Sequence, residues 1–298
     1  PTGFPALDSV RFSQYNGNFQ SPFRENLLFG KLDGEINEKS TFELSVSNRH
    51  ETDIKDFGGG TAFTTATNNH NYNTVAQLKH NYFTGPWLNE AKVDFSQFHR
   101  GFSPTNAGDA RRRYNYNGSD QFIGSATSTQ EYLQKRLGLR NDLTYTGLQL
   151  GGEHVFKGGV SLSHLTYDIN KDNGGTPEFH YAQTANTGNG DQPYNYAVPF
   201  ELFYGTGDPK LITHNNQIGA YLQDDWAPVE RLTLNLGVRW DYETNMLNSD
   251  YVTPQQYVDT LRRYNSQLLI PLDLNRYIST GNNRRNFKGA FQPRPGLA

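Results

Sequence analysis

The chain has 298 residues, a formal net charge of -3 and a mean hydropathy of -0.76. No stretch approaches the roughly 18 consecutive apolar residues of a membrane-spanning helix, so the sequence excludes a helical membrane protein. The lack of cysteine excludes a disulfide framework and a thiolate metal site, and the small negative charge predicts no nucleic-acid partner.

The composition suits a β-sheet protein. Aromatic residues make up 13% of the chain, with 18 tyrosines and 19 phenylalanines, and these residues are favoured in strands and at membrane interfaces. A transmembrane β-barrel is hydrophilic on average, because its loops and its lumen are polar. The low mean hydropathy is therefore compatible with a membrane barrel.

Alternation of apolar and polar residues predicts strands along much of the chain. The first strand is expected over residues 7–15. Three hairpins with short turns should follow, formed by residues 26–33 with 41–50, 72–84 with 90–99, and 132–146 with 154–168.

The most regular alternation lies in a hairpin at residues 216–242, whose strands are joined by a short link at 227–230. In its second strand, apolar side chains occupy one parity and polar side chains the other. For a barrel, we expect the apolar set to face lipid: Leu232, Leu234, Leu236, Val238 and Trp240. We expect the polar set to face the lumen: Thr233, Asn235, Arg239 and Asp241. A soluble sandwich strand would show the same alternation.

One short surface helix is expected in the segment after residue 242. Thr253 can act as its N-cap, with Pro254 at the first helical position and Gln256 at the third. Apolar residues follow at helical spacing, namely Val258, Leu261 and Tyr264.

The connections between the predicted strands alternate in length. Short ones are expected at residues 34–40, 85–89, 147–153 and 227–230, and long ones at 51–71, 100–130, 170–213 and 243–288. Soluble sandwiches normally keep their loops under about 15 residues. Outer-membrane barrels combine short periplasmic turns with long extracellular loops, so the alternation favours a membrane barrel.

Several segments resemble TonB-dependent outer-membrane receptors, most closely the Oar-like subfamily. The resemblance is strongest at Tyr221–Trp226 and Arg231–Asp241, and it extends to Asn141–Thr144, Gly152–Val160 and Pro293–Gly296. The family usually has an apolar residue where this chain has Pro295.

The resemblance implies an all-β fold, an antiparallel transmembrane barrel of which residues 1–298 would supply about nine or ten strands of a larger wall. The plug domain and the segment that engages the energy-coupling protein are expected upstream, so the chain is interpreted as an internal piece of a receptor. The implied location is the outer membrane of a Gram-negative-type bacterium. The implied function is uptake of a scarce or bulky nutrient, such as a siderophore, an oligosaccharide or a peptide. The implied partners are outer-membrane lipid, lipopolysaccharide, a TonB-type protein and an unknown small ligand.

The sequence contains no motif for catalysis, and we predict neither an enzyme nor a bound cofactor. Histidines in the predicted strands (His80, His99, His154 and His164) lack metal-ligand spacing along the chain, so no metal site is expected. The segment Asp168–Gly174 is similar to the start of a calcium loop, but its glycine is one position late and Phe179 replaces the final glutamate. A polar turn is the preferred interpretation of this segment.

Two basic runs in the predicted extracellular loops are candidates for contacting an anionic ligand or lipopolysaccharide. They comprise Arg111, Arg112 and Arg113 with the adjoining Tyr114, and Arg284 with Arg285. A solvated loop without a ligand would also show such runs.

Two other functions fit the sequence. One is an adhesive or structural barrel that binds surfaces through its loops without transport. The other is a soluble all-β module that binds polysaccharide, in which the apolar residues of strand 232–242 would be buried in a core.

Overall fold

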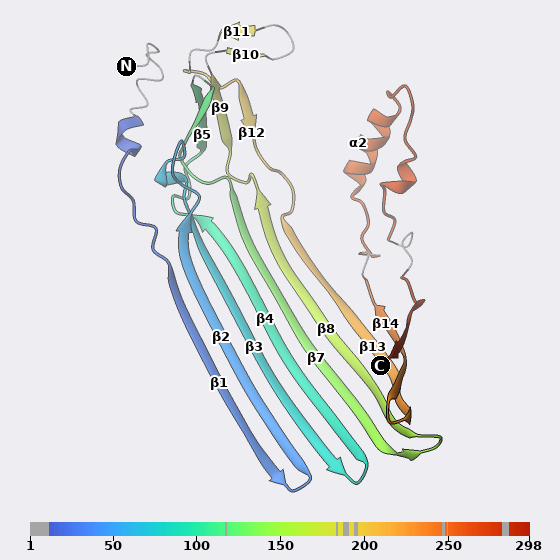
Figure 1. Cartoon of the computed structure of the whole chain (residues 1–298). Coiled ribbons are helices and arrows are strands. Elements are labelled where there is room, and N and C mark those ends of the chain that lie inside the picture. Colours follow the sequence, from blue (N-terminus) through green and yellow to red (C-terminus); the bar gives the residue numbers. More distant parts are fainter. Residues whose placement is uncertain are drawn as a thin grey trace.

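The computed structural model describes residues 12–116, 118–182, 184–186, 191–193, 196–245, 248, 250–281 and 286–298. Its main feature is a nine-stranded antiparallel sheet, here called the wall, in which each strand pairs with the next wall strand along the chain (Figure 1). The strands are β1 (Arg24–Asn37), β2 (Ser40–Lys55), β3 (Thr67–Thr84), β4 (Trp87–Pro104), β7 (Ser128–Gln149), β8 (Glu153–Asn173), β13 (Lys210–Val229), β14 (Leu232–Glu243) and β15 (Ala290–Leu297).

The register of the wall gathers apolar side chains on one side, here called the apolar face. Residues directly opposite each other in paired strands share a face. One row across β2, β3, β4, β7 and β8 consists of Leu44, Leu78, Val93, Leu139 and Leu162, which are between 39 and 46% exposed. A soluble protein would cover such a continuous apolar surface.

The other side of the wall, here called the polar face, carries rows of charged residues. Lys31 and Lys79 flank Glu43 at 3.0 and 3.9 Å. Further along the sheet, Arg136 lies 3.2 Å from Asp94. Opposite charges on neighbouring strands thus neutralise one another across the polar face.

The connections lie at two ends of the wall and differ in length, as the sequence predicts. At one end the links are residues 38–39, 85–86, 150–152 and 230–231. Gly85, Gly151 and Gly152 have positive φ there, and a Cβ on Gly152 would lie 2.2 Å from the Ala227 carbonyl oxygen. At the other end the links are 56–66, 105–127, 174–209 and 244–289.

The wall strands are longer than predicted. β7 and β8 have 22 and 21 residues, whereas a transmembrane strand needs only about 9–11. The extensions beyond the apolar rows are polar, such as residues 67–71 of β3 (Thr-Asn-Asn-His-Asn) and 170–173 of β8 (Asn-Lys-Asp-Asn), without a clear alternation. Backbone pairing with neighbouring strands continues where the hydrophobic pattern has stopped, so the first three long connections are shorter than expected.

Two of the long connections contain a second sheet, here called the loop sheet, instead of irregular loops. It consists of β5 (Arg111–Tyr116), β6 (Ser119–Ile123), β9 (Glu178–Ala182) and β12 (Glu201–Phe203), in the order β12-β9-β5-β6. β5 and β9 pair in parallel although they come from different connections. Tyr114, Ile123 and Tyr196 form its buried core. A separate pair is formed by β10 (Thr184–Asn186) and β11 (Asp191–Pro193).

The N-terminal strand prediction is wrong where the structure describes it. Phe12–Tyr15 form the 3-10 helix η1, and residues 7–11 lie outside the described residues. Phe12 contacts the ring of Tyr114 edge-on at 5.6 Å between centroids. This segment therefore packs on the loop sheet instead of extending the wall.

The predicted helix is present as α2 (Gln255–Asn265), but its cap differs from the expected one. Pro254 occupies the N-cap position, and the Thr253 hydroxyl accepts a hydrogen bond from the Ser279 amide instead of from the helix. Two further 3-10 helices are η2 (Phe63–Thr65) and η3 (Leu274–Arg276). No helix in the described ranges is long and apolar enough to span a membrane.

The final segment forms an edge strand that tolerates two prolines. Thr233 and Ala298 exchange both backbone hydrogen bonds, so residues 292, 294 and 296 direct their amides toward β14. Pro293 and Pro295 occupy the alternate positions, where an amide would point to the free edge. The departure from the family at Pro295 therefore does not interrupt pairing with β14.

Candidate binding site in the loop sheet and on the polar face

The three consecutive arginines of β5 lie in the loop sheet, and each has an acidic partner. Arg111 Nε lies 3.4 Å from a Glu178 carboxylate oxygen, without a well-aligned hydrogen bond, and its guanidinium stacks 4.5 Å above the Phe122 ring centroid. Burial lowers the pKa of Arg111 from its ordinary value. This arginine ties β5 to the neighbouring strands β6 and β9.

The other two arginines pair within their own connection and are partly exposed. Arg112 donates to Asp109 at 2.8 Å, and Arg113 lies 2.6 Å from Asp120. The hydrogen bond from Arg113 lowers the pKa of the Asp120 carboxyl and raises that of Arg113. An anionic ligand would have to compete with these carboxylates.

Tyr114 lies in the core of the loop sheet and is not available as a surface contact. Its side chain is 5% exposed and stacks on Tyr181 with 4.7 Å between ring centroids. Burial raises the pKa of its phenol to about 12. The structure therefore assigns this residue to packing, while Arg284 and Arg285 lie outside the described residues.

His180 was not singled out in the sequence, and it joins two strands of the loop sheet. Its buried imidazole contacts Glu201 through Nδ1 at 2.9 Å and Glu178 through Nε2 at 2.8 Å. Because Glu178 also forms an ion pair with Arg111, one network of hydrogen bonds and an ion pair crosses β5, β9 and β12. This network fixes the two connections to each other.

The four polar residues of β14 all lie on the polar face. Arg239 binds Asp241 through its guanidinium at 2.7 Å, and Asp241 also accepts a hydrogen bond from Gln292 at 3.0 Å. Thr233 and Asn235 lie nearer the short turns, opposite Ala298 and Gly296. Their parity along the strand thus puts all four on one side of the sheet, and their orientation toward the lumen stays a prediction.

The polar face is hollowed by a cavity of about 500 Å³ between charged side chains. Small residues create this space, since a Cβ on Gly138 would lie 2.7 Å from Asp94 and one on Gly219 would lie 2.8 Å from Ser161. Arg136, Arg140 and Arg239 border the cavity. Its lining contains both positively and negatively charged side chains, which a polar ligand or a protein segment could contact.

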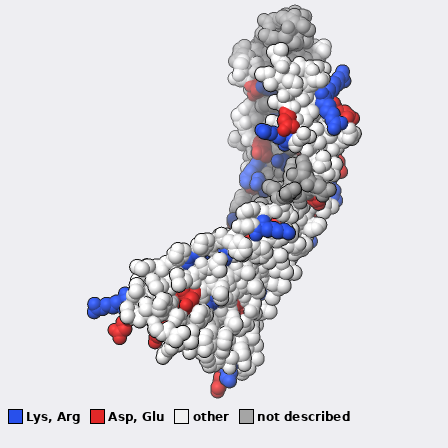
Figure 2. Space-filling view, turned by 90° about the vertical axis from the view of Figure 1, so that its right-hand side faces the viewer, with Lys and Arg blue, Asp and Glu red and all other residues white. Residues whose placement is uncertain are grey.

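The apolar residues of β14 lie on the apolar face, as their parity predicts. Leu236 and Val238 are 50 and 44% exposed, and the Trp240 indole donates to the Lys288 carbonyl at 2.9 Å. Leu232 and Leu234 are half-buried at the end near the short turn. In Figure 2, charged side chains concentrate at the short-turn end and toward the long connections, with a mostly uncharged zone between.

The segment Asp168–Gly174 does not form a calcium loop. Residues 168–173 continue β8 and pair with β7, and residues 168–170 also pair with β13. Successive side chains in a strand point to opposite faces, so these oxygens do not converge on one cation. The expected polar turn begins at Gly174, which has a positive φ.

A family model described as an outer membrane beta barrel domain matches residues 2–298. The chain belongs to this family. It is an all-β protein of the Gram-negative outer membrane, with short periplasmic turns and long extracellular connections. The soluble-module alternative is therefore wrong, in agreement with the exposed apolar face.

The similar proteins are transporters and receptors. The TonB-dependent transporter Oar of Myxococcus xanthus is 35% identical over 100 residues, which cover 31% of this chain and 9% of Oar. The structure of the outer membrane transporter YddB from Escherichia coli aligns with a TM-score of 0.52 and 8% identity, covering 74% of this chain and 27% of YddB.

FpvA of P. aeruginosa, in a complex with a pyoverdine and iron, aligns with a TM-score of 0.51 and 14% identity, covering 92% of this chain and 33% of FpvA. At these identities, the two solved structures show a shared fold. The chain spans a third or less of the length of each of these proteins.

Proposed function

We propose that this chain forms part of the wall of a TonB-dependent receptor that imports a scarce or bulky nutrient through a plugged barrel. The observation that carries the proposal is a single antiparallel sheet with an exposed apolar face, a charged opposite face and an ordered loop sheet at the extracellular end. The similarity to the transporter Oar supports it. No covalent chemistry is required of the chain.

The apolar face meets lipid, and the polar face lines the lumen. Leu232, Leu234, Leu236, Val238 and Trp240 would then contact lipid. Tyr82, Trp87 and Tyr145 lie near the short turns and would form the periplasmic aromatic belt, where Trp87 and Tyr145 are 4.4 Å apart between ring centroids. Thr233, Asn235, Arg239 and Asp241 would face the plug or the substrate path.

Additional strands complete the wall. In the structure the sheet is open, with β1 and β15 at its two edges. Unpaired backbone groups are not tolerated in the hydrocarbon region, so both edges require partners. In this proposal they come from a longer chain that closes about 22 strands around a plug and that also carries the segment engaging a TonB-type protein.

The loop sheet presents the ligand-binding surface. The backbone pairing of β5 with β9 and the Arg111–Glu178 ion pair hold two extracellular connections together, and Arg112 and Arg113 remain partly exposed on the loop sheet. A siderophore, an oligosaccharide or a peptide could be held by such a surface. An anionic group on the ligand would displace Asp109 or Asp120 from its arginine.

Uptake by cells of the native host tests the proposal. We expect deletion of the full-length gene to abolish accumulation of one radiolabelled substrate among ferric siderophores, oligosaccharides and peptides, and deletion of the energy-coupling protein to have the same effect. A variant lacking residues 108–124 should bind that substrate poorly while its barrel still folds. Unchanged uptake of all three classes, together with loss of cell attachment, would instead support the adhesive alternative.

A further inference from the structure

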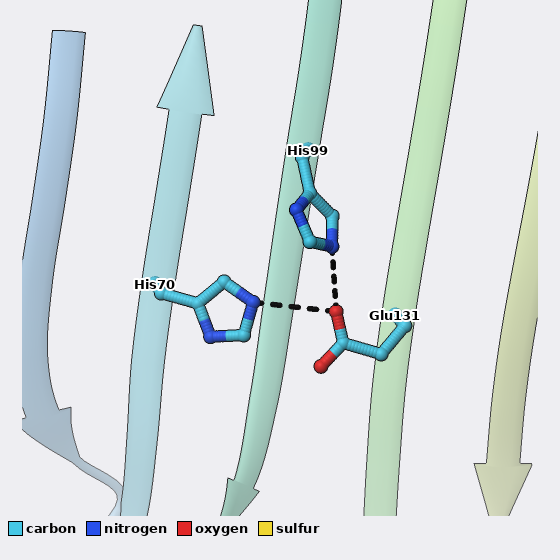
Figure 3. A group of neighbouring side chains, drawn as sticks. All are labelled: His70, His99 and Glu131. Carbon is cyan, nitrogen blue, oxygen red and sulfur yellow. Dashed lines mark hydrogen bonds and ion pairs between the residues drawn. The ribbon is translucent and has the colours of Figure 1, made fainter.

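Three metal-ligating side chains meet on the apolar-face side of the wall, near its extracellular end. His70 on β3, His99 on β4 and Glu131 on β7 point toward one another from three adjacent strands (Figure 3). The register aligns His70, Gly101 and Glu131 in one row, and His99 lies two residues before Gly101 on the same face. The cluster lies beyond the apolar rows and outside the loop sheet.

The ligand atoms are already close enough to share one ion. The Glu131 carboxylate oxygen Oε2 lies 2.7 Å from His99 Nε2 and 3.2 Å from His70 Nε2. All three ligand atoms lie within 4.8 Å of one another. A tetrahedral ion with bonds of about 2.0–2.2 Å holds its ligand atoms at comparable separations.

The backbone under the cluster leaves space for these side chains. A Cβ on Gly101 would lie 2.4 Å from His70 Nε2 and 2.5 Å from Glu131 Oε2. The rings are also supported from the side, because Tyr72 stacks on His99 with 5.8 Å between centroids and His50 stacks on Tyr72 at 4.1 Å. Glycine at 101 and the ring stack thus pre-form the geometry.

We propose that His70, His99 and Glu131 bind a divalent transition-metal ion of the Zn²⁺ class. Two imidazole nitrogens and one carboxylate oxygen suit Zn²⁺ better than Ca²⁺ or Mg²⁺, which prefer oxygen ligands. The side chains are 27, 30 and 49% exposed, so an ion and a water in the fourth position have access from outside. The ion clips β3, β4 and β7 together where they leave the membrane.

This site is independent of the proposed transport function, because it depends only on the wall's register. The test uses the full-length receptor in detergent, purified without a polyhistidine tag and stripped with a chelator. Co²⁺ is titrated first, followed by its displacement with Zn²⁺. We expect the wild type to bind one more equivalent than the His70→Asn, His99→Gln double variant, with the intense visible absorption of four-coordinate Co²⁺.

Two further variants sharpen the test. Glu131→Gln retains the size of the side chain and should weaken binding at least as much as the roughly 10–100-fold loss that follows removal of an outer-shell partner. Gly101→Ala removes no ligand but should also abolish the signal. His80→Gln is the matched control, since His80 lies on the same face of β3 near the short turns and contacts Ser40 instead of a carboxylate.

Folding is checked for each variant by its heat-dependent mobility on a denaturing gel. If the double variant does not fold, the comparison of Glu131→Gln with the wild type decides the result. Equal binding by the wild type, Glu131→Gln and Gly101→Ala would overturn the proposal. A lower thermal stability of the variants without a change in bound metal would identify the cluster as a hydrogen-bonded clip only.

Discussion

At the scale of residues, the arginines of β5 form a basic run in the sequence, but each has an acidic partner in the structure. In the sequence, Arg111–Arg113 form a run of three positive charges. In the structure, the three pair with Glu178, Asp109 and Asp120. A ligand must therefore compete with these carboxylates for the arginines. The contribution of the ion pairs to the stability of the loop sheet depends on pH.

The Arg113–Asp120 pair gives a pH prediction. Its hydrogen bond lowers the pKa of Asp120 in the folded state. The pair therefore contributes stability above the unfolded-state pKa of about 3.9, and this contribution is lost as the pH falls through the lower folded-state pKa. We expect pepsin to cut the Asp120→Asn variant within the loop sheet roughly two- to fivefold faster than the wild type at about pH 5. The effect is small because the ion pair is partly exposed.

The measurement compares peptic cleavage of the wild type and Asp120→Asn in the folded full-length receptor across the acid range. Their rates should converge at the lowest pH, where Asp120 is protonated in both states. Asp109→Asn is a second comparison within the same connection. Equal rates for wild type and Asp120→Asn at about pH 5 would show that the pair does not stabilise the loop sheet.

At the scale of elements, the strands of the wall follow the alternation in the sequence closely. Every predicted hairpin is present, because each pairs segments that are neighbours along the chain. The strand ends are less predictable. Residues such as His70 and Asn71 continue β3 only because β2 and β4 pair with them.

The apolar face of β4 and β7 gives a prediction that depends on depth in the membrane. Leu139 lies in the middle of the apolar face, whereas Gln97 lies near its extracellular end, one row beyond Phe95 and Leu137. We expect Leu139→Arg to lower the free energy of unfolding by about 2–4 kcal/mol, and Gln97→Arg to lower it by about 0–1 kcal/mol, as for lipid-facing sites at the midplane and the interface.

The measurement is reversible urea unfolding of the full-length receptor in phospholipid vesicles. Leu139→Ala is the control that removes the side chain without adding a charge. If Leu139→Arg costs no more than Leu139→Ala, the apolar face does not meet lipid, and the orientation proposed for the wall is wrong.

At the scale of the whole molecule, the open sheet leaves two strand edges without partners in the described part of the chain. β1 presents a free edge of 14 residues. On the opposite edge, Pro293 and Pro295 remove two amide donors, which leaves fewer groups for a following strand to bind. The two edges of the wall therefore differ in how many backbone amides they offer to a further strand.

We expect the isolated chain of 298 residues to form oligomers in detergent, because its edges can pair with other copies. The full-length receptor should be monomeric and heat-modifiable under the same conditions. Light scattering and gel mobility distinguish the two. A monodisperse, heat-modifiable monomer of the isolated chain would show that these strands close a barrel without additional ones.

The alternation in the sequence by itself determined the wall, its two faces and the unequal lengths of its connections, because period-2 patterning and turn residues act between near neighbours. Only the tertiary structure decided which distant residues meet. The parallel pairing of β5 with β9 and the cluster of His70, His99 and Glu131 depend on register between segments that are about 30 to 70 residues apart. Local patterns do not specify such contacts, because they are set by how strands align across the sheet and by which connections fold against each other.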